Sequence, residues 1–302
     1  MNKPFEIQWH GAPTTGGSVV IGIFDGVHKG HQLIIRKARE SGEVVALTFY
    51  PHPAEILNPS AAPTELLPLN ERINQLIASG VSSVAVLSFT KEFSEMSPQD
   101  FIDEIIKKTL DAKSITVGSN FRFGHKARGD VSYLKEFSGI AVTGLDLAVE
   151  LGTSISSTRI REAITNGNIE IARELLTRPH LLIGNVIHGE KRGRAIGYPT
   201  ANISLSKRST IPSDGVYAGW LTVEGNKWPA AISIGTNPTF AGDRNRQVEA
   251  YALDQTNLDL YEKVARVEFG WRLRDTIKFD GLDPLLAQMK VDCEKARELT
   301  RN

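Results

Sequence analysis

The pattern of apolar residues changes part-way along the chain, and this change constrains the fold more than any other feature. Before about residue 180, short runs rich in β-branched residues alternate with amphipathic stretches, which is typical of buried parallel strands joined by helices. The four clearest runs cover residues 19–24, 44–49, 83–89 and 114–118. This alternation predicts a doubly wound, Rossmann-like α/β domain, in which ligands bind beyond the carboxyl ends of the strands.

The clearest helix in this half covers residues 97–110. Ser97 suits the N-cap and Pro98 the first helical position, while two lysines lie near the negative end of the helix dipole. The apolar side chains between them recur at the spacing of one helical face. They are Phe101, Ile102, Ile105, Ile106 and Leu110.

After Pro179 the chain shows short strands separated by glycine-rich turns, with no helices between them. This pattern favours a small antiparallel barrel or sandwich. One amphipathic helix, at 282–299, closes the chain. We therefore expect two domains, 1–180 and 181–302, which agrees with a length of 302 residues and a usual domain size of about 150.

Charge balance and hydropathy narrow the class of partner. The chain has 35 Lys and Arg residues against 35 Asp and Glu residues, which argues against the broad basic face of a nucleic-acid-binding protein. No stretch approaches the ~20 apolar residues of a membrane helix, and the first residues lack the layout of a signal peptide. We therefore expect a cytoplasmic protein that binds neither nucleic acid nor membrane.

The only cysteine, Cys293, excludes an internal disulfide and any multi-cysteine metal site. It recurs with the apolar residues of the last helix, so we interpret it as a small core residue rather than a reactive thiol. The histidine spacing does not suggest a zinc site either.

A turn with two histidines follows the first strand, in the sequence GIFDGVHKGH (22–31), and leads into a predicted helix. Backbone N–H groups and the helix dipole favour phosphate at such a turn, and a glycine lets it approach closely. Imidazoles there can stabilise the charge that develops when an α-phosphate is attacked and pyrophosphate leaves. Two surface histidines in a tight turn are the alternative, but the Phe-Asp-Gly directly after a buried strand favours function. The candidate catalytic residues are His28 and His31, and the candidate ATP-binding residues are Phe24, Gly26 and Gly30.

The sequence ISSTRIREAI (155–164) opens a second predicted helix. A hydroxyl cluster in this position is usually only a helix cap, whereas arginines one turn later can reach phosphates. Its co-occurrence with the histidine turn favours a role in binding ATP. The candidates are Ser156, Ser157, Thr158 and Arg161, with Arg159 as a second cation.

Two polar segments follow other strands of the predicted sheet: FYPHP (49–53) and GSNFRFGHKARGD (118–130). The second contains aromatic rings for stacking and an amide for a nucleotide or flavin edge. An ordinary surface loop is the alternative, but loops beyond the strand ends of such a sheet are where ligands bind. The flavin-binding candidates are Pro51, His52, Pro53, Asn120, Phe121 and Phe123.

The second half carries a different motif, HGEKRGRAIGYPTANI (188–203). Its glycines and basic residues, from His188 onward, suit a flap over ATP phosphates. A hydroxyl and an amide two residues apart on an extended segment project the same way and can hold one Mg²⁺. The alternative is a hairpin with a basic tip and a proline at an edge strand, and the segment is not a Walker A loop. The ATP-binding candidates are Gly193, Arg194 and Gly197, and the metal-binding candidates are Thr200 and Asn202.

Glu249 lies at the start of a predicted strand, between Val248 and Ala250, so its side chain points away from its apolar neighbours. A carboxylate there can accept the proton of a substrate hydroxyl that attacks a γ-phosphate. An outward glutamate is normally just solvated, and only the preceding motif favours a catalytic role.

The first half of the chain resembles the FMN adenylyltransferase module of bifunctional prokaryotic riboflavin kinase/FAD synthetases. The motifs that carry this resemblance are, in order, GIFDGVHKGH, FYPHP, NFRFGHKARGD and ISSTRIR. This resemblance covers nearly all of the first 165 residues. Residues from 181 to about 300 resemble the riboflavin kinase module of the same family. Three positions depart from the usual family pattern without matching a catalytic position: Ile23, Tyr251 and Glu262.

The resemblance implies two ATP-dependent reactions. The C-terminal domain would convert riboflavin to FMN with release of ADP, and the N-terminal nucleotidyltransferase domain would join FMN to the AMP part of a second ATP, giving FAD and pyrophosphate. In the family, the Thr and Asn matching Thr200 and Asn202 bind Mg-nucleotide, and the glutamate matching Glu249 is the base. Mg²⁺ arriving with ATP is the only metal we expect.

Two alternatives stay open. One is a nucleotidyltransferase for another phosphorylated acceptor, such as nicotinate mononucleotide or phosphopantetheine, which leaves the second domain unexplained. The other is a flavin-binding regulator or carrier without turnover, against which the joint presence of the histidines and Glu249 argues. No feature of the sequence indicates an oligomeric state.

Overall fold

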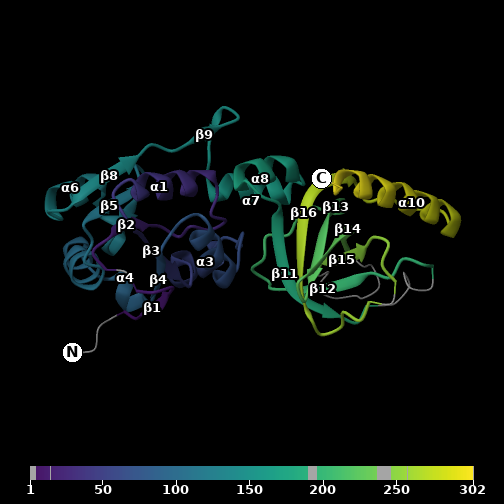
Figure 1. Cartoon of the computed structure of the whole chain (residues 1–302), viewed down its shortest axis with the longest axis horizontal. Coiled ribbons are helices and arrows are strands. Elements are labelled where there is room, and N and C mark those ends of the chain that lie inside the picture. The colour runs from purple at the N-terminus through teal and green to yellow at the C-terminus, as the bar shows by residue number, and fades with distance from the viewer. Residues whose placement is uncertain (1–4, 14, 190–195, 237–245, 257, 302) are drawn as a thin grey trace. The chain divides into compact units, whose positions relative to one another are not determined.

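The computed structural model describes residues 5–13, 15–189, 196–236, 246–256 and 258–301, which form two compact units (Figure 1). The first comprises Met1–Pro63 and Pro68–Ser156, and the second comprises Thr64–Leu67 and Ser157–Asn302. The residues between Ser157 and the expected boundary at 180 therefore belong to the second compact unit.

A six-stranded sheet forms the centre of the first unit. Its strand order is β1-β4-β3-β2-β5-β8, and every neighbouring pair is parallel except β1 with β4. The strands are β1 (Ile7–His10), β2 (Ser18–Ile21), β3 (Val44–Tyr50), β4 (Ser83–Ser88), β5 (Ser114–Gly118) and β8 (Ala141–Leu145). The predicted doubly wound domain is confirmed. The edge strands β1 and β8 were not predicted, because their partly exposed residues lack the continuous apolar runs of the inner strands.

Helices and short elements connect these strands or, in the case of β9 and β10, follow the last of them. The helices are α1 (Lys29–Arg39), α2 (Pro53–Leu57), α3 (Leu69–Ala78), α4 (Lys91–Ser94), α5 (Pro98–Asp100) and α6 (Val131–Phe137). The short elements are η1 (Pro59–Ala61), β6 (Arg122–Phe123), η3 (His125–Ala127), β7 (Gly129–Asp130), β9 (Val149–Glu150) and β10 (Thr153–Ser154).

The helix expected at 97–110 is confirmed. The Ser97 hydroxyl caps it by accepting a hydrogen bond from the backbone N–H of Asp100 over 3.0 Å, and the predicted apolar face is buried. After α5 the helix continues as a π-helix, η2 (Phe101–Thr109). Leu110, for example, donates its N–H to the carbonyl of Ile105, five residues earlier, so the turns are wider than the α-helix expected from the periodicity.

The second unit is built on a closed barrel, with the strand order β11-β12-β15-β14-β13-β16 and antiparallel pairing throughout. Closure between β11 and β16 decides in favour of the barrel over the sandwich. The strands are β11 (His180–Ile187), β12 (Ala201–Leu205), β13 (Gly215–Val223), β14 (Asn226–Thr236), β15 (Arg246–Ala252) and β16 (Val264–Arg274).

Within the described residues, the helices that accompany the barrel are α7 (Ser157–Thr165), α8 (Ile169–Leu176) and α10 (Leu282–Leu299). The closing helix α10 has the predicted bounds and lies along one side of the barrel, in contact with β13, β14 and β16 (Figure 1). Cys293 is buried there with Ala218, Leu253 and Ala296, which confirms that it is a small core residue.

A short excursion of the chain, Thr64–Leu67, also belongs to the second unit. The N–H of Glu65 donates to the carbonyl of Arg208 over 2.6 Å, and the N–H of Thr210 donates to the carbonyl of Glu65 over 3.0 Å. The two compact units are therefore not two uninterrupted stretches of sequence. Among the described residues, no helix is long and apolar enough to cross a membrane.

Candidate functional site

The turn after β2 has an unusual backbone. Phe24, Gly26 and Val27 have φ angles of 54°, 82° and 40°, and a left-handed conformation costs about 1–3 kcal/mol at a residue other than glycine. The carbonyl of Ile23, just before the turn, accepts hydrogen bonds from the Thr48 hydroxyl (3.1 Å) and from Nη1 of Arg72 (2.8 Å). Side chains from β3 and α3 thus fix the peptide that leads into the strained part of the turn.

Both motif histidines lie at the start of α1. His28 is the N-cap and is 5% exposed, and its Nδ1 accepts a long hydrogen bond of 3.4 Å from the backbone N–H of His31. The two imidazole rings are stacked, with centroids 3.6 Å apart and planes 17° apart. The Phe24 ring completes the group in a T-shaped arrangement with His31, with ring centroids 5.2 Å apart. The two motif histidines and Phe24 thus form one packed cluster at the start of α1.

Gly30 has a second reason to be glycine besides the expected close approach of phosphate. A Cβ atom at this position would lie 3.2 Å from both Cε1 and Nδ1 of His28. The missing side chain therefore makes room for the His28 ring over the first turn of α1. The Cβ position is also 3.9 Å from the side chain of Ile155, so the segment that carries Ser156 runs beside the start of this helix.

Electrostatics keeps His31 neutral at pH 7. Burial of the ring, followed by the charges of His28 and Arg72, holds the pKa of His31 well below its ordinary value. Nδ1 of His31 is buried and has no hydrogen-bond partner within the described part of the chain. A neutral imidazole can carry its proton on this nitrogen and donate it to a phosphate oxygen, so the cluster suits a polyphosphate ligand.

The candidate flavin residues follow strands next to β2. Because β3, β2 and β5 are parallel neighbours, the segments after them leave the sheet at the same edge. His52 caps α2, with its Nδ1 accepting from the N–H of Ala54 over 3.1 Å, and Pro51 and Pro53 flank it. Asn120 is exposed beyond β5. These placements agree with a ligand at this edge, and the contacts of each residue with a flavin stay a prediction.

The two phenylalanines of the loop after β5 differ in their surroundings. Phe121 and Phe123 stack with centroids 5.6 Å apart, but Phe123 is only 7% exposed and lies against Phe101 in the core of the first unit. Phe121, which is half-buried, is therefore the ring of the pair with more surface to offer a ligand.

The remaining candidates of the first motif set lie at the start of α7. Ser157, Thr158 and Arg161 belong to the second compact unit, whereas Ser156 belongs to the first. Nε of Arg161 donates to the carbonyl of Thr64 over 2.6 Å, within the second unit. Their place relative to the two histidines stays a prediction.

The second unit brings Thr200, Asn202 and Glu249 together. The Thr200 hydroxyl donates to Oε2 of Glu249 over 3.1 Å, and Asn202 on β12 lies directly opposite Glu249 on β15. Ser233 on β14 faces Glu249 from the other side. Since the apolar neighbours Val248 and Ala250 are buried, the predicted outward direction of Glu249 is confirmed.

Gly189 is packed against this group, because a Cβ atom there would collide with the Asn202 amide. Gly197 has a φ angle of 87° and open space around it. Gly193 and Arg194 lie outside the described residues. His188 is exposed, with its ring centroid 3.9 Å from that of Tyr261.

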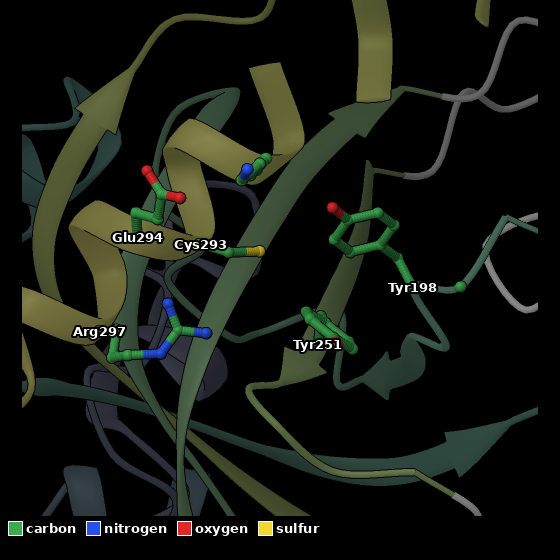
Figure 2. Close-up of a pocket in the computed structure, with 7 residues that line it drawn as sticks. Tyr198, Tyr251, Cys293, Glu294 and Arg297 are labelled. Atoms are coloured by element: carbon green, nitrogen blue, oxygen red, sulfur yellow. The ribbon is translucent and has the colours of Figure 1, made fainter. Parts of the chain in front are cut away.

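An open cavity of about 350 Å³ lies within the second unit, and its lining residues do not include Thr200, Asn202 or Glu249. Tyr251 lines it and is two residues after Glu249 on β15, so both side chains project from the same face of the strand. Figure 2 shows the sulfur of Cys293 pointing toward the rings of Tyr198 and Tyr251, whose centroids are 5.4 Å apart. The rest of the lining comprises Gly197, Lys290, Glu294 and Arg297. The cavity offers aromatic surface to a planar ligand.

Two lining groups are uncharged at pH 7. Burial raises the pKa of the Cys293 thiol to about 11, with a smaller contribution from the negative charge of Asp292. Burial also raises the pKa of Tyr251. Cys293 is therefore an apolar wall of the cavity rather than a nucleophile.

Sequence reasoning missed Arg72 and Ser233. Arg72 lies on the apolar side of α3, at helical spacing from Leu69 and Leu76, and it is 2% exposed. A charged residue on the buried face of an amphipathic helix is a usable signal, because it must be paired inside. Ser233 carried no such signal, because only the barrel register places it opposite Glu249.

The described residues contain no group of three or more His, Cys, Asp or Glu side chains that could hold a metal ion. The hydroxyl, amide and carboxylate oxygens of Thr200, Asn202 and Glu249 are nevertheless the type of ligand that hard divalent cations prefer. Such a cation would need ATP oxygens to complete its coordination.

Two family models match the chain in the order of its units: an FAD synthetase model over residues 12–159 and a riboflavin kinase model over residues 176–300. The first model matches the α/β unit with the histidine turn, and the second matches the barrel with the Thr–Glu pair. The chain is thus a two-domain enzyme of flavin nucleotide synthesis.

Curated relatives identify the family. The chain is 37% identical over 296 residues to the bifunctional riboflavin kinase/FMN adenylyltransferase of Escherichia coli, covering 95% of this chain and 94% of that protein. It is 36% identical over 287 residues to the enzyme of the same name from Listeria monocytogenes, covering 92% and 91%. The chain belongs to the bifunctional riboflavin kinase/FMN adenylyltransferase family.

A solved structure is similar over almost the whole chain. It is a crystal structure of a Streptococcus pneumoniae protein named a macrolide-efflux protein, with a TM-score of 0.87, 36% identity and coverage of 95% of both chains. The architecture described above is therefore shared with a solved protein.

Proposed function

We propose that the chain converts riboflavin to FAD in two ATP-dependent steps, one in each domain, 1–180 and 181–302. The second domain would transfer the γ-phosphate of ATP to riboflavin, releasing FMN and ADP. The first domain would join FMN to the AMP part of another ATP, releasing pyrophosphate. The observation that carries this proposal is the presence of two chemically different groups, the His28–His31 stack and the Thr200–Glu249 pair, in different compact units.

In the kinase step, Glu249 would accept the proton of the ribityl 5′-hydroxyl as its oxygen attacks the γ-phosphorus and the bond to ADP breaks. The Thr200 hydroxyl, 3.1 Å from Oε2, orients this carboxylate. The cavity lined by Tyr198 and Tyr251 would hold the flavin ring beside it, with the tyrosines supplying contact surface.

In the adenylyl transfer step, a phosphate oxygen of FMN would attack the α-phosphorus of ATP while the bond to pyrophosphate breaks. His28 and His31, at the start of α1, would donate hydrogen bonds to the oxygens that gain charge. The positive end of the helix adds to this stabilisation. Asn120, Arg161 and the hydroxyls of residues 156–158 would orient the substrates.

Mg²⁺ bound to ATP would neutralise phosphate charge in the kinase site. Thr200 and Asn202 would hold it through their oxygens, while Glu249 keeps its role toward the substrate hydroxyl. Because both steps consume ATP, we place them in the cytoplasm.

The test is to incubate the purified chain with riboflavin, ATP and Mg²⁺ and to separate the flavins by chromatography. His28→Ala should lower FAD formation by about 10² to 10³-fold and leave FMN formation intact. Glu249→Ala should abolish FMN formation but still convert added FMN to FAD. Equal impairment of both steps by either substitution would show that the two-site assignment is wrong, and a chain that forms neither product would contradict the function itself.

A further inference from the structure

A buried arginine supports the histidine turn from outside the motif. Arg72 lies in the first turn of α3 and is 2% exposed. Burying a guanidinium is costly unless it is hydrogen-bonded and its charge is compensated. A buried arginine therefore has either a structural or a functional role. The groups that it contacts show which of these roles it has.

Arg72 acts on the peptide that leads into the strained turn. Its Nη1 donates to the carbonyl of Ile23 over 2.8 Å, and the Thr48 hydroxyl donates to the same oxygen over 3.1 Å. Two donors on one carbonyl restrict the orientation of the Ile23–Phe24 peptide plane, and that plane sets the φ angle of Phe24, which is 54°. The Phe24 ring in turn packs against His31 in a T-shaped arrangement.

The charge of Arg72 also reaches His31. Burial is the largest cause of the lowered pKa of His31, and the charges of His28, at the start of α1, and Arg72, on α3, lower it further. Arg72 therefore favours an imidazole that is neutral, with one nitrogen able to donate and the other able to accept.

We propose that Arg72 is a positioning residue for adenylyl transfer: it holds the Ile23 carbonyl so that the strained turn presents Phe24 and His31 in their working geometry. This inference rests on the proposed function of the first domain and extends it to a residue outside the motif. Arg72 itself need not touch either substrate.

The test compares four variants of the full chain, with both activities measured on each preparation. Arg72→Met removes the charge and the hydrogen bond to Ile23, together with the other contacts of the guanidinium. Arg72→Lys keeps the charge on a shorter head group without the guanidinium fork. Thr48→Val removes only the second donor to Ile23, and Arg36→Met removes an arginine exposed on α1 as the matched control.

We expect Arg72→Met to lower kcat for FAD formation about 10²-fold, in line with about 10² for a misplacement near 1 Å. The KM values for FMN and ATP should change little, and riboflavin kinase activity should stay intact. Arg72→Lys and Thr48→Val should each lower kcat about tenfold, a loss equivalent to one hydrogen bond. Arg36→Met should match the wild type.

The pH dependence separates positioning from simple stabilisation. Loss of the positive charge should raise the pKa of His31, so the acidic limb of the rate profile should move to higher pH in Arg72→Met. The limb should stay in place in Arg72→Lys and Thr48→Val. A proton NMR titration of His31 without substrates should show the same shift, which gives a measurement independent of turnover.

Formation of FAD from FMN by the wild type tests the proposed function of the first domain. The variants test the role of Arg72 separately. The inference is overturned if Arg72→Met forms FAD at the wild-type rate or loses both activities in proportion. If Arg72→Met does not fold, Arg72→Lys takes its place, and unchanged FAD formation by that variant overturns the inference equally. Selective loss in Arg72→Lys and Thr48→Val, with an intact kinase, supports it.

Discussion

Replacement of Gly30 by alanine should make α1 more stable and the first domain less active. Gly30 is in the first turn of α1 and has no positive φ angle, so alanine fits the backbone and gains up to about 1 kcal/mol of helix propensity. The new Cβ, however, would lie 3.2 Å from two atoms of the His28 ring. That ring must then move by a few tenths of an ångström.

The size of the rate effect follows from this displacement. If a misplacement of 1 Å costs about 10²-fold, a shift of a few tenths corresponds to roughly fivefold in FAD formation. FMN formation should not change, because its groups lie on the barrel. The rates would be measured by separating FMN and FAD, and stability by urea unfolding followed by circular dichroism.

Asn74→Ala is the matched control, since Asn74 is exposed on α3 and gains helix propensity without approaching His28. It should raise stability slightly and leave both activities unchanged. A Gly30→Ala variant with full FAD formation would refute the argument that the His28 ring needs this space. If Gly30→Ala also lowered the free energy of unfolding, the idea that Gly30 serves only to make room for the His28 ring would be wrong.

Two further predictions concern the second domain and pH. Thr200→Val removes the hydroxyl that donates to Glu249 over 3.1 Å and that would also hold Mg²⁺, so kcat for FMN formation should fall by at least about 10-fold while added FMN is still converted to FAD; an unchanged kinase rate would contradict both roles of Thr200. The pKa of His31 is lower in the folded chain than its ordinary value of 6.5, so below about pH 6.5 the unfolded state binds more protons than the folded state. The free energy of unfolding should therefore decrease as the pH is lowered from 6.5, by up to about 1.4 kcal/mol per pH unit. Above that pH both states are neutral at this residue and its contribution is constant. Urea unfolding between pH 5 and 8 should show this slope in the wild type and a smaller slope in His31→Gln, and equal slopes would contradict a buried neutral His31.

Features that depend on local spacing were predictable from sequence. The alternation of Val248, Glu249 and Ala250 was sufficient to place the carboxylate outside the apolar face, because side chains alternate along a strand whatever it pairs with. The cap at Ser97 followed for the same reason, since cap and first turn are adjacent in the chain. The turn with His28 and His31 lies within one motif, and their stacking needs only the first turn of α1.

Features that depend on distant partners were not predictable. The edge strand β1 is half-exposed and becomes a strand by pairing with β4. Phe123 lies in an exposed-looking polar segment, yet its ring is in the core against Phe101. Arg72 carried a signal in its place on the apolar face of α3, but its partner, the Ile23 carbonyl, is 49 positions away and is brought to it only by tertiary folding.

The sequence by itself determined which chemical groups are available and in which direction each leaves its own strand or helix, because those directions follow from local backbone periodicity. Only the tertiary structure decided which of these groups meet. Thr200 and Glu249 are 49 positions apart and come within 3.1 Å because β12 and β15 pair in one register of a closed barrel. A shift of one residue in that register would turn the carboxylate toward the barrel interior, so the proposed kinase site depends on strand pairing that no single motif encodes.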